Sequence, residues 1–462
     1  MITIYVEMVA DLFHYGHVEF LRKAKALGDR LVVGVLSDEW AEEYKRKPVI
    51  TAQERAKVIE GCRYVDEVII QAEPATGKWL KKNDYILAIA LKNEADKARH
   101  IATSIGHNKA REIELPYEYG ISTTDIIQRI QEREKALKDE IATIKKFFAP
   151  RWQGHEWLLA EQTLKDIGNL FKKHGIEYFL AFGSLIGAVR HQGVIPWDDD
   201  IDIAITEKDE EKLKSIAWVF KKAGYNLACY TRELHNYMEI YYKISTIGRK
   251  NSPNRIHSWP FVDIFILRSS KVNPEKCHLD YRELNKSDIF PLKQAKFGNL
   301  MLPVPGNQEI LATLYNADYM IECFSTNYIH RNEKKCEIIS RPAAKVIEAG
   351  CFVDIHEMAQ KIRSSVPARK QGWILDIETL EIKGHGMHLK INTELANLWN
   401  IIDGKRSVNE IFVLYKLPVI QAMNRVLIDL GTLQAHNTIF FTDGMENAFN
   451  IKPAEIMHTS EV

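Results

Sequence analysis

Four aspartates lie close together near the middle of the chain, in a run that reads GVIPWDDDIDIAI. Because side chains alternate between the two faces of a β-strand, a strand here would place Asp198, Asp200 and Asp202 on one face and Asp199 on the other. Carboxylates held this close repel one another, and bound divalent cations commonly offset that repulsion. A solvated acidic turn is the alternative, but the run is embedded in apolar residues. We therefore expect a metal site for Mg²⁺ or Mn²⁺ that handles phosphate.

Two histidines form a second group, in the run His14-Tyr15-Gly16-His17. They follow a strand-like segment and open a helix-like one, and the N-terminus of a helix attracts phosphate. Two imidazoles there could donate hydrogen bonds to a nucleotide and stabilise charge that develops during phosphoryl transfer. The glycine lets the backbone approach a ligand closely. The spacing alone is a weak signal, since paired histidines at a turn often serve structure only.

Composition restricts the classes of partner. The chain has 462 residues, enough for about three domains, and 62 basic side chains balance 62 acidic ones. No global field therefore favours nucleic acid or an anionic membrane. The six cysteines include no CxxC pair, which argues against a disulfide framework or a zinc site. No stretch is long and apolar enough to span a membrane. We expect a cytoplasmic protein, with peripheral contact at the inner face of the membrane as an alternative.

The first two thirds of the chain divide into two domains and a linker. Residues 1–130 alternate strand-like and helix-like runs, which predicts βαβ units, a parallel sheet and an α/β fold. Residues 131–150 are charged and apolar at helical spacing, which predicts a helical linker. Residues 151–330 mix helices with alternating strands such as YMEIYYKIST and FVDIFIL, as an α+β domain would.

The first domain resembles the cytidylyltransferases that activate phosphoethanolamine, phosphocholine or glycerol 3-phosphate with CTP. The resemblance covers residues 2–130 and rests on the HYGH run, VVGVLSDE, ERAKVIEGCRYVDEV and GISTTDI. It implies a Rossmann-like HxGH nucleotidyltransferase fold, in which His14 and His17 hold the triphosphate of CTP. It further implies catalytic or phosphate-binding roles for Asp11, Lys45, Arg63, Ser122 and Thr123.

Three departures from that family surround the nucleotide rather than the histidines. Met8 stands where the family has a glycine, Tyr117-Glu118-Tyr119 replaces a segment with a phosphate-pairing arginine, and Ala90-Leu91-Lys92-Asn93 replaces a Gly-Asp-Asp near the base pocket. They leave three options open: a changed choice of nucleotide, a slower enzyme, or a domain that binds without turnover.

The acidic run resembles the LicD family of phosphotransferases, which includes the fukutin-related proteins and has a nucleotidyltransferase-like fold. The resemblance covers about residues 155 to 325. It implies transfer of a phospho-alcohol group from a CDP-linked donor to a sugar hydroxyl. Asp200 and Asp202 would bind the metal with help from Asp198, and Asp263 in FVDIF would be a further metal ligand or the general base.

The same resemblance implies residues for the donor phosphates. Gly183 and Ser184 would begin a helix whose N-terminus holds a phosphate. Arg190 and Lys243 would pair with the pyrophosphate.

The C-terminal part follows a connector at residues 331–364. Residues 365–445 predict a hairpin and then helices, and resemble the small winged-helix-like PqqD domains, which bind peptide segments. We expect an interaction module with a peptide or protein partner here and no catalytic group. Residues 446–462 form a tail. A homodimer is one assembly that the sequence leaves open.

Together these expectations describe an enzyme with two activities. The first domain would make a CDP-alcohol from CTP and a phospho-alcohol, and the second would transfer the phospho-alcohol group to a glycan on a cell-surface polysaccharide or lipid-linked sugar. In one alternative only the LicD-like domain is catalytic, and the N-terminal domain is a degenerate nucleotide-binding or docking domain. In another, the chain is an interaction protein that recruits a partner through its C-terminal module.

Overall fold

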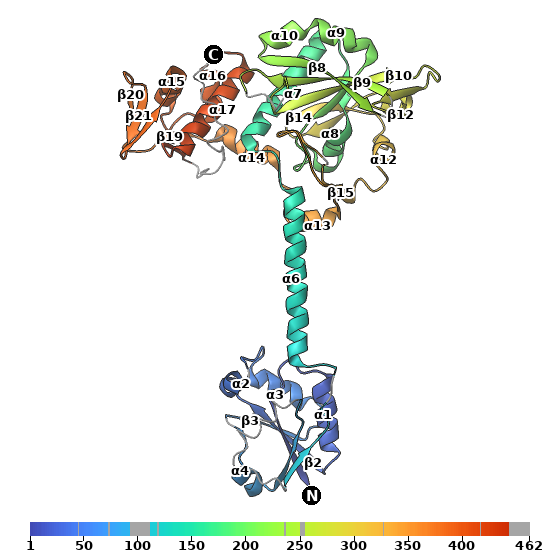
Figure 1. Ribbon diagram of the computed structural model, residues 1–462, viewed down its shortest axis with the longest axis vertical. Helices are drawn as coiled ribbons and strands as arrows, with labels where there is room; N and C mark the ends of the chain where they lie inside the picture. Colours follow the sequence, from blue (N-terminus) through green and yellow to red (C-terminus); the bar gives the residue numbers. More distant parts are fainter. Residues whose placement is uncertain are drawn as a thin grey trace. The chain divides into compact units, whose positions relative to one another are not determined.

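The chain folds into two compact units, Met1–Glu140 and Ile141–Val462, in the computed structural model (Figure 1). The structure describes residues 1–44, 46–72, 74–92, 111–117, 120–234, 237–249, 255–326, 328–415 and 417–442. The two later domains expected from the sequence thus fall in one compact unit. The expected tail at 446–462 lies outside the described residues.

The first unit is built on a parallel sheet with the strand order β3-β2-β1-β4-β5, as the alternating pattern predicts. Its strands are β1 (Thr3–Met8), β2 (Arg30–Leu36), β3 (Glu67–Gln71), β4 (Tyr85–Ile89) and β5 (Glu112–Glu114). The strand order reverses between β1 and β4. A crevice for ligands forms at such a switch point, at the carboxyl ends of the strands.

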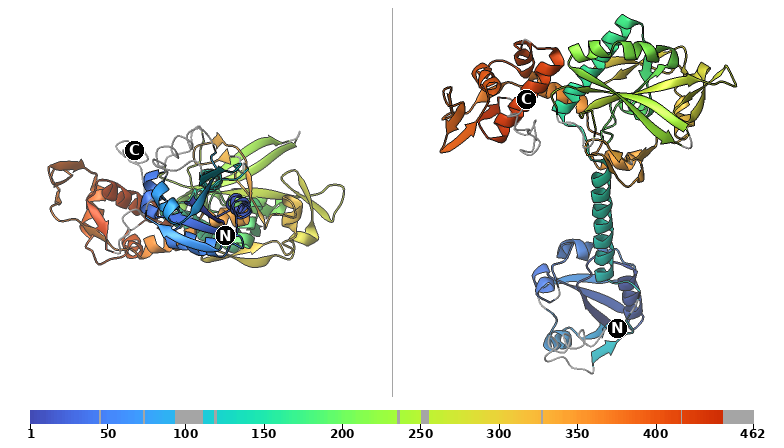
Figure 2. Two further views of the ribbon diagram at one scale, coloured as in Figure 1. Left: turned by 90° about the horizontal axis from the view of Figure 1, so that it is seen from below. Right: turned by 45° about the horizontal axis from the view of Figure 1, so that its top comes forward.

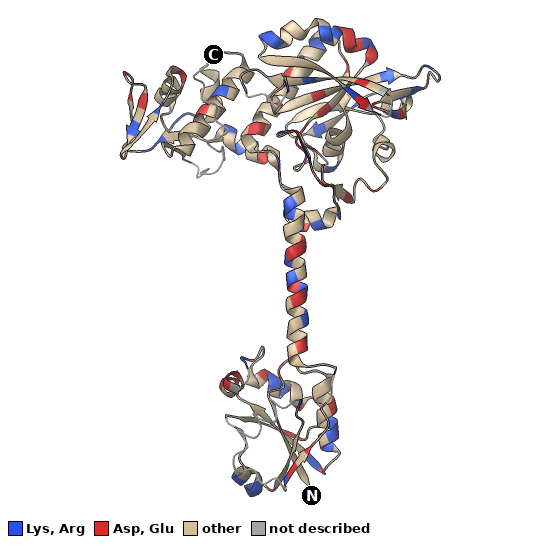
Figure 3. Cartoon of the chain, viewed as in Figure 1, with Lys and Arg blue, Asp and Glu red and all other residues tan. Residues whose placement is uncertain are grey.

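Among the described residues, the helices of this unit are α1 (Tyr15–Lys25), α2 (Asp38–Tyr44), α3 (Ala52–Glu60) and α4 (Gly77–Lys82), and α6 (Thr123–Phe148) begins in it and continues past its last residue, Glu140. Helices α1, α3 and α4 pack on strands of the sheet. Thr51 and Glu54 form a capping box at the start of α3. The expected helical linker at 131–150 lies mostly within α6, which carries basic and acidic side chains along its length (Figure 3).

The second unit contains a mixed sheet in the order β12-β11-β10-β7-β6, with β9 also paired to β10 and β8 to β9. Its strands are β6 (Tyr178–Leu180), β7 (Asp202–Thr206), β8 (Tyr225–Leu234), β9 (Tyr237–Thr246), β10 (Phe261–Ser269), β11 (Lys276–Leu279) and β12 (Arg282–Asn285). The pair β7 and β10 is parallel, and the other pairs are antiparallel.

Helices and short hairpins surround this mixed sheet. The helices are α7 (Gly154–His174), α8 (Phe182–Ile186), α9 (Glu210–Ser215), α10 (Ala217–Lys222), α11 (Lys286–Ile289), α12 (Ile310–Leu314), α13 (Ala343–Glu348) and α14 (Ile355–Ser364), with a π-helical turn η2 (Gly187–His191) and a 3-10 turn η3 (Glu207–Asp209). The short strands are β13 (Lys293–Phe297), β14 (Leu300–Val304), β15 (Glu322–Phe324), β16 (Tyr328–Ile329), β17 (Lys334–Lys335) and β18 (Ser340–Pro342).

The C-terminal segment has two small antiparallel sheets and three helices, of which α17 packs on α7 (Figure 2). Its elements are β19 (Pro367–Arg369), β20 (Ile374–Asp376), β21 (Glu381–Gly384), β22 (Met387–Lys390), α15 (Thr393–Ile401), α16 (Val408–Val413), α17 (Val419–Ala435) and β23 (Ile439–Phe441). Trp399 is buried, as expected for a core residue. The winged-helix-like class and the PqqD-like role stay predictions.

His356 of α14 shows how the connector joins the core of the second unit. Its ring packs edge-on against Trp157 of α7, with ring centroids 4.6 Å apart. Within the described residues, neither ring nitrogen has a hydrogen-bond partner. Burial lowers the pKa of His356 to about 4; Lys296 adds to this effect and Asp354 opposes it. The folded chain therefore holds this histidine neutral.

We expect the second unit to lose stability as the pH falls from 7 toward 4. The unfolded chain protonates His356 near pH 6.5, whereas the folded chain resists protonation down to about pH 4, so the contribution is complete above pH 6.5 and is lost as the pH falls. His356→Leu should reduce the change in the free energy of unfolding with pH by at most about 1.4 kcal/mol per pH unit in that range. Thermal unfolding of the full chain at several pH values measures this, with the exposed His388→Leu as control. Equal slopes for the two variants would contradict the assignment.

Candidate active sites

A pocket of about 330 Å³ opens at the carboxyl ends of β1 and β4, where the strand order reverses. His14, His17, Asp11, Ser122 and Thr123 all line it. The structure thus brings together five of the residues predicted for the nucleotide site, from the loop after β1, the start of α1 and the start of α6.

Hydrogen bonds from backbone N–H groups orient the two imidazoles of this pocket. Their rings stack with centroids 3.8 Å apart. Nδ1 of His14 accepts a hydrogen bond from the backbone N–H of Gly16 at 3.2 Å, and Nδ1 of His17 accepts from the backbone N–H of His14 at 3.3 Å. Burial lowers the pKa of His14, and the Asp125 carboxylate opposes this effect. A neutral ring whose Nδ1 accepts carries its proton on Nε2, so each ring can donate to phosphate.

The other predicted residues of the pocket hold its walls together. Oδ1 of the buried Asp11 accepts from the backbone N–H of Val49 at 2.9 Å, which fixes the loop before α3. The hydroxyl of Thr123 donates to the carbonyl of Asp11 at 2.7 Å, and that of Ser122 donates to Asp125 at 2.8 Å. These side chains position the start of α6 next to the histidines.

The structure does not place Arg63 at this pocket. Its side chain is exposed and stacks on Tyr64, with the guanidinium carbon 5.0 Å from the ring centroid. The pocket is lined instead by Arg46, whose guanidinium lies 3.4 Å from Oδ2 of Asp11. Lys45 lies outside the described residues. The sequence pattern missed Arg46, although it directly follows the predicted lysine.

The departures from the cytidylyltransferase pattern do surround the pocket. Met8, Ala90, Lys92 and Tyr117 line it, which places side chains of changed character against any bound nucleotide. The remaining departures, Glu118, Tyr119 and Asn93, lie outside the described residues.

Glu7, near the end of β1, is a pocket residue that the sequence analysis missed. Burial raises the pKa of its carboxyl to about 7, although the backbone N–H of Ala75 donates to it at 2.7 Å and Tyr5 donates from its hydroxyl. Trp40 also lines the pocket. A half-buried carboxylate of this kind would be stabilised in its charged form by a bound cation.

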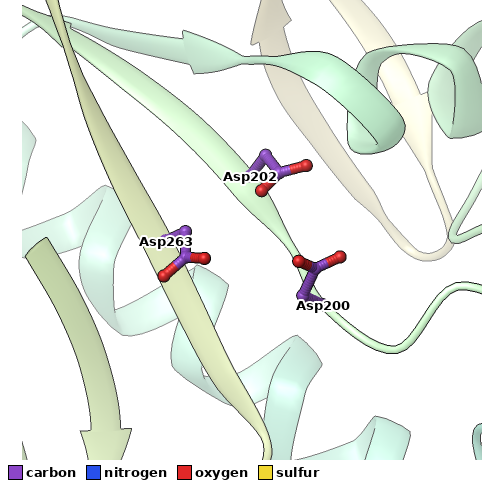
Figure 4. A group of neighbouring side chains, drawn as sticks. All are labelled: Asp200, Asp202 and Asp263. Atoms are coloured by element: carbon purple, nitrogen blue, oxygen red, sulfur yellow. The ribbon is translucent and has the colours of Figure 1, made fainter. Parts of the chain in front are cut away.

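The second candidate site is formed by Asp200, Asp202 and Asp263, whose carboxylates approach one another across two strands (Figure 4). One oxygen from each lies within 4.8 Å of the others. Asp202 begins β7 and pairs in parallel register with Asp263 of β10, so the sheet itself holds these two side by side. The sequence predicted all three residues.

The acidic segment before β7 differs from the expected strand. The strand begins at Asp202 rather than Asp198, because a turn precedes it, in which the N–H of Asp198 donates to the carbonyl of Ile195. The carbonyl of Asp199 accepts from the indole of Trp259 at 2.6 Å, and that of Asp198 accepts from the indole of Trp152. Indole donors therefore replace strand pairing in this segment.

Asp198 is not one of the three carboxylates that lie within 4.8 Å of one another, but it lies close enough to raise the pKa of Asp202. It faces α8, where a Cβ atom on Gly183 would come within 2.4 Å of its Oδ2. The glycine therefore makes room for this carboxylate. Ser184 accepts a hydrogen bond from the backbone N–H of Asp202 at 2.9 Å, which latches α8 to the start of β7. The helix α8 has only five residues, so its dipole is a weak source of phosphate binding.

Burial and mutual repulsion shift the pKa values of these acids upward. Burial raises the pKa of Asp202 well above its usual value, and Asp200, Asp263 and Asp198 add to the shift. The pKa of Asp198 rises well above its usual value for the same reasons. Burial also raises the pKa of Asp263, although Lys243 opposes it. Holding these carboxylates in their charged form therefore destabilises the folded chain, because too little positive charge lies beside them.

Lys243 of β9 supplies part of that positive charge. Its ammonium lies 2.7 Å from Oδ1 of Asp263, its partner in the β9–β10 register, and 3.6 Å from the ring centroid of Phe261. Both charged groups are buried. Lys243, predicted to pair with pyrophosphate, is therefore engaged with a carboxylate in this structure.

Asp199 and His330 connect the acidic segment to a loop far along the chain. His330 lies 3.2 Å from Asp199 through Nδ1 and 3.3 Å from Asp200 through Nε2. The backbone N–H of Arg331 donates to Asp199 at 3.0 Å. Burial opposes a charge on His330, but Asp200 and Asp199 outweigh it and raise its pKa to about 9. No local signal predicted His330.

Arg190 does not reach the second site. Its guanidinium is largely buried and donates to the carbonyls of Tyr319 at 2.7 Å and Glu322 at 3.0 Å. It fixes the segment before β15 instead of binding pyrophosphate. The pocket beside the carboxylates, of about 530 Å³, does not include it.

The donor set of the second site suits a hard divalent cation. Its ligands are carboxylate oxygens, which Mg²⁺ and Mn²⁺ prefer, and Asp200, Asp202 and Asp263 are the residues that would hold the ion. The upward pKa shifts of Asp202 and Asp263 are those of carboxyls that lack a sufficient counter-charge.

Each of the two units matches a known protein family over part of its length. Residues 9–129 match the family model described as cytidylyltransferase-like, and residues 175–307 match that of LicD/FKTN/FKRP, nucleotidyltransferase domain. The FAD synthase of Pyrococcus horikoshii is 37% identical over 139 residues, which are 28% of this chain and 93% of that protein. The chain belongs to the cytidylyltransferase-like family through residues 9–129.

Other relatives match this chain over part of their own length. The probable ethanolamine-phosphate cytidylyltransferase of Encephalitozoon cuniculi is 37% identical over 127 residues, 26% of this chain and 38% of that protein. The ethanolamine-phosphate cytidylyltransferase of Arabidopsis thaliana is 36% identical over 151 residues, 30% of this chain and 35% of that protein. The chain covers 55% of an uncharacterized protein of Rickettsia typhi. It thus spans about a third to a half of these three relatives.

These matches support an enzyme of the nucleotidyltransferase class, with a cytidylyltransferase-like domain and a LicD domain. Among the described residues, no helix is long and apolar enough to cross a membrane.

We expect Gly183→Ala to disturb the second site from outside the carboxylate group. The new Cβ would collide with Asp198, which must then move against Asp202. Changes next to metal ligands typically lower metal affinity about 10- to 100-fold. Titration with Mn²⁺, followed by electron paramagnetic resonance of the free ion, measures this. Gly61→Ala, whose Cβ would meet nothing closer than 3.4 Å, is the control. Unchanged Mn²⁺ affinity in Gly183→Ala would contradict the crowding argument.

Proposed function

We propose that the chain is a two-step enzyme that makes a CDP-alcohol at its first site and transfers the phospho-alcohol group from it at its second. The observation that carries this proposal is the presence, in one chain, of a paired-histidine phosphate site and a three-carboxylate metal site. The first suits nucleotidyl transfer from a nucleoside triphosphate, and the second suits phosphoryl transfer assisted by a divalent cation.

At the first site, the phosphate oxygen of a phospho-alcohol attacks the α-phosphorus of CTP, and pyrophosphate leaves. His14 and His17 donate from Nε2 to the phosphates, where negative charge grows as the bond to pyrophosphate breaks. The start of α1 adds backbone N–H groups next to them. No acid or base is required for this displacement, because the attacking phosphate is already ionised at neutral pH.

Phosphoethanolamine is the phospho-alcohol that we propose for this pocket. Glu7 is a half-buried carboxylate in the same pocket as the histidines, and its raised pKa of about 7 would fall again beside an ammonium group. Glycerol 3-phosphate would bring no such charge. The ethanolamine-phosphate cytidylyltransferases among the relatives point the same way.

At the second site, the phospho-alcohol group passes from the CDP-linked donor to a glycan hydroxyl, and CMP leaves. Asp200, Asp202 and Asp263 would hold Mg²⁺ or Mn²⁺, which neutralises phosphate charge when bound. Lys243 and His330 hold two of these carboxylates in position. The C-terminal module would bind a peptide or protein partner.

A second candidate for the first site is adenylyl transfer. The FAD synthase relative is covered over almost its whole length, and the changed residues Met8 and Ala90 surround the nucleotide. A domain that binds a nucleotide without turnover is the other alternative.

We expect the full chain to release pyrophosphate from CTP and phosphoethanolamine in the presence of Mg²⁺. His17→Ala should lower this rate about 10²- to 10³-fold, because one donor to the developing charge is lost. A coupled pyrophosphate assay with phosphocholine, glycerol 3-phosphate and, separately, ATP with flavin mononucleotide measures the choice of substrates. Arg63→Gln, outside the pocket, is the control. Release of pyrophosphate only from ATP with flavin mononucleotide would show that the first site uses ATP instead of CTP. Release from none of these pairs would mean that the first domain binds a nucleotide without turnover.

We expect Asp202→Asn to abolish only the second step. The substitution keeps the shape of the side chain but removes a carboxylate charge from the metal site, so release of CMP from CDP-ethanolamine should fall at least about 10²-fold. Pyrophosphate release at the first site should stay as in the unchanged chain, because the two sites lie in different compact units. Chromatography of the nucleotides follows both steps. Equal loss of both would refute two independent sites.

A further inference from the structure

The pocket beside the three carboxylates has four lysine and arginine side chains on its wall, besides His330. They are Arg232, Lys243, Arg255 and Arg282. Such a concentration of cations next to a metal site suits the phosphates of a nucleotide-linked donor. Which of them is available for a ligand depends on the carboxylates that already pair with them.

Three of the four cations are paired within the protein. Arg232 contacts Glu239 and lies 3.6 Å from Asp280. Lys243 pairs with Asp263 at 2.7 Å. Arg255 lies 3.1 Å from Glu333, which also lines the pocket. A phosphate that recruited any of these three would first have to displace a carboxylate.

Arg282, the first residue of β12, is held in a different way. Its guanidinium lies over the rings of Tyr281, Phe182 and Tyr315, with the guanidinium carbon 5.1, 5.5 and 5.9 Å from their centroids. Among the described residues, no carboxylate lies within 4.0 Å of it. Aromatic stacking orients a guanidinium and leaves the N–H donors at its edge available for a planar or tetrahedral anion.

Tyr315 places this arginine near the carboxylates. Burial raises the pKa of the Tyr315 hydroxyl, Asp202 and Asp198 add to the shift, and Arg282 opposes it. The same ring therefore lies within electrostatic range of both the acids and the arginine. Phe182, which stacks with Arg282, directly precedes Gly183 and lines the pocket together with Asp200 and Asp202.

We propose that Arg282 binds the nucleotide-side phosphate of the donor diphosphate at the second site, a role for which the sequence suggested Arg190 and Lys243. The assignment rests on the proposed second step. In that step the bond between the alcohol-bearing phosphorus and the bridging oxygen breaks, and its electron pair stays on the departing nucleoside monophosphate. The acceptor hydroxyl forms the new bond to phosphorus and releases its proton to water. Arg282 stabilises the negative charge that the departing phosphate gains.

Binding of CMP tests this assignment without turnover. CMP is titrated into the full chain in the presence of Mn²⁺ by calorimetry, and the second-site event is the one that disappears in Asp202→Asn. Arg282→Gln should weaken this event at least tenfold. Arg282→Lys should recover only part of the loss, because an ammonium lacks the planar pair of donors. Arg268→Gln, on β10 and paired with Glu210 outside the pocket, should leave it unchanged.

Kinetics with CDP-ethanolamine separate this inference from the proposed function. Arg282→Gln should raise KM and lower kcat for donor cleavage while the thermal unfolding midpoint changes by no more than in Arg268→Gln. One outcome would overturn the role of Arg282 and leave the proposed function standing. In it, the unchanged chain cleaves CDP-ethanolamine, and the CMP affinity of Arg282→Gln stays within twofold of that of the unchanged chain. Absence of both donor cleavage and the Mn²⁺-dependent CMP event would overturn both.

Discussion

Repulsion among buried carboxylates is the interaction on which the second unit depends. Asp200, Asp202 and Asp263 have oxygens within 4.8 Å of one another. Two unit charges 4 Å apart repel by about 4 kcal/mol at an effective dielectric constant of 20. Asp202 and Asp263 cannot separate, because they are neighbours in the register of β7 and β10. The charge must therefore be balanced by protons, by basic side chains or by a metal ion.

Much of the surrounding structure serves that balance. β9 brings Lys243 beside Asp263, and the long chain from β10 to β16 returns to bring His330 beside Asp200. Asp199 points away from the three acids and holds the loop that carries His330. This loop lies beyond residues 175–307, the region that matches the LicD family model. His330, which completes the site, thus lies outside the residues matched by that model.

The features that could be predicted from the sequence are those that depend on residues close together along the chain. The spacing of His14 and His17 at a junction of strand and helix, and the parallel sheet of the first unit, follow from neighbouring residues. Asp263 was expected from the family resemblance, since an isolated aspartate in a strand carries little information. His330 had no local signal, because its contact with Asp199 joins residues 131 positions apart. Arg190 was expected on phosphate, but its guanidinium satisfies backbone carbonyls whose positions only tertiary packing determines.

The two sites differ in how they balance the negative charge of a bound phosphate. The first is built from donors that belong to the chain: two imidazoles whose Nδ1 atoms accept backbone hydrogen bonds, which leaves Nε2 to donate, and the backbone N–H groups at the start of α1. Its charge complement is therefore present as soon as the unit folds. At the second, the carboxylates of Asp200, Asp202 and Asp263 lie together and repel a phosphate brought close to them until a cation is bound. Binding of donor and cation there must be coupled, because each supplies the charge that the other requires. Arg282, whose charge no described carboxylate neutralises, is the one basic group of that pocket that can attract the donor before any internal ion pair is broken.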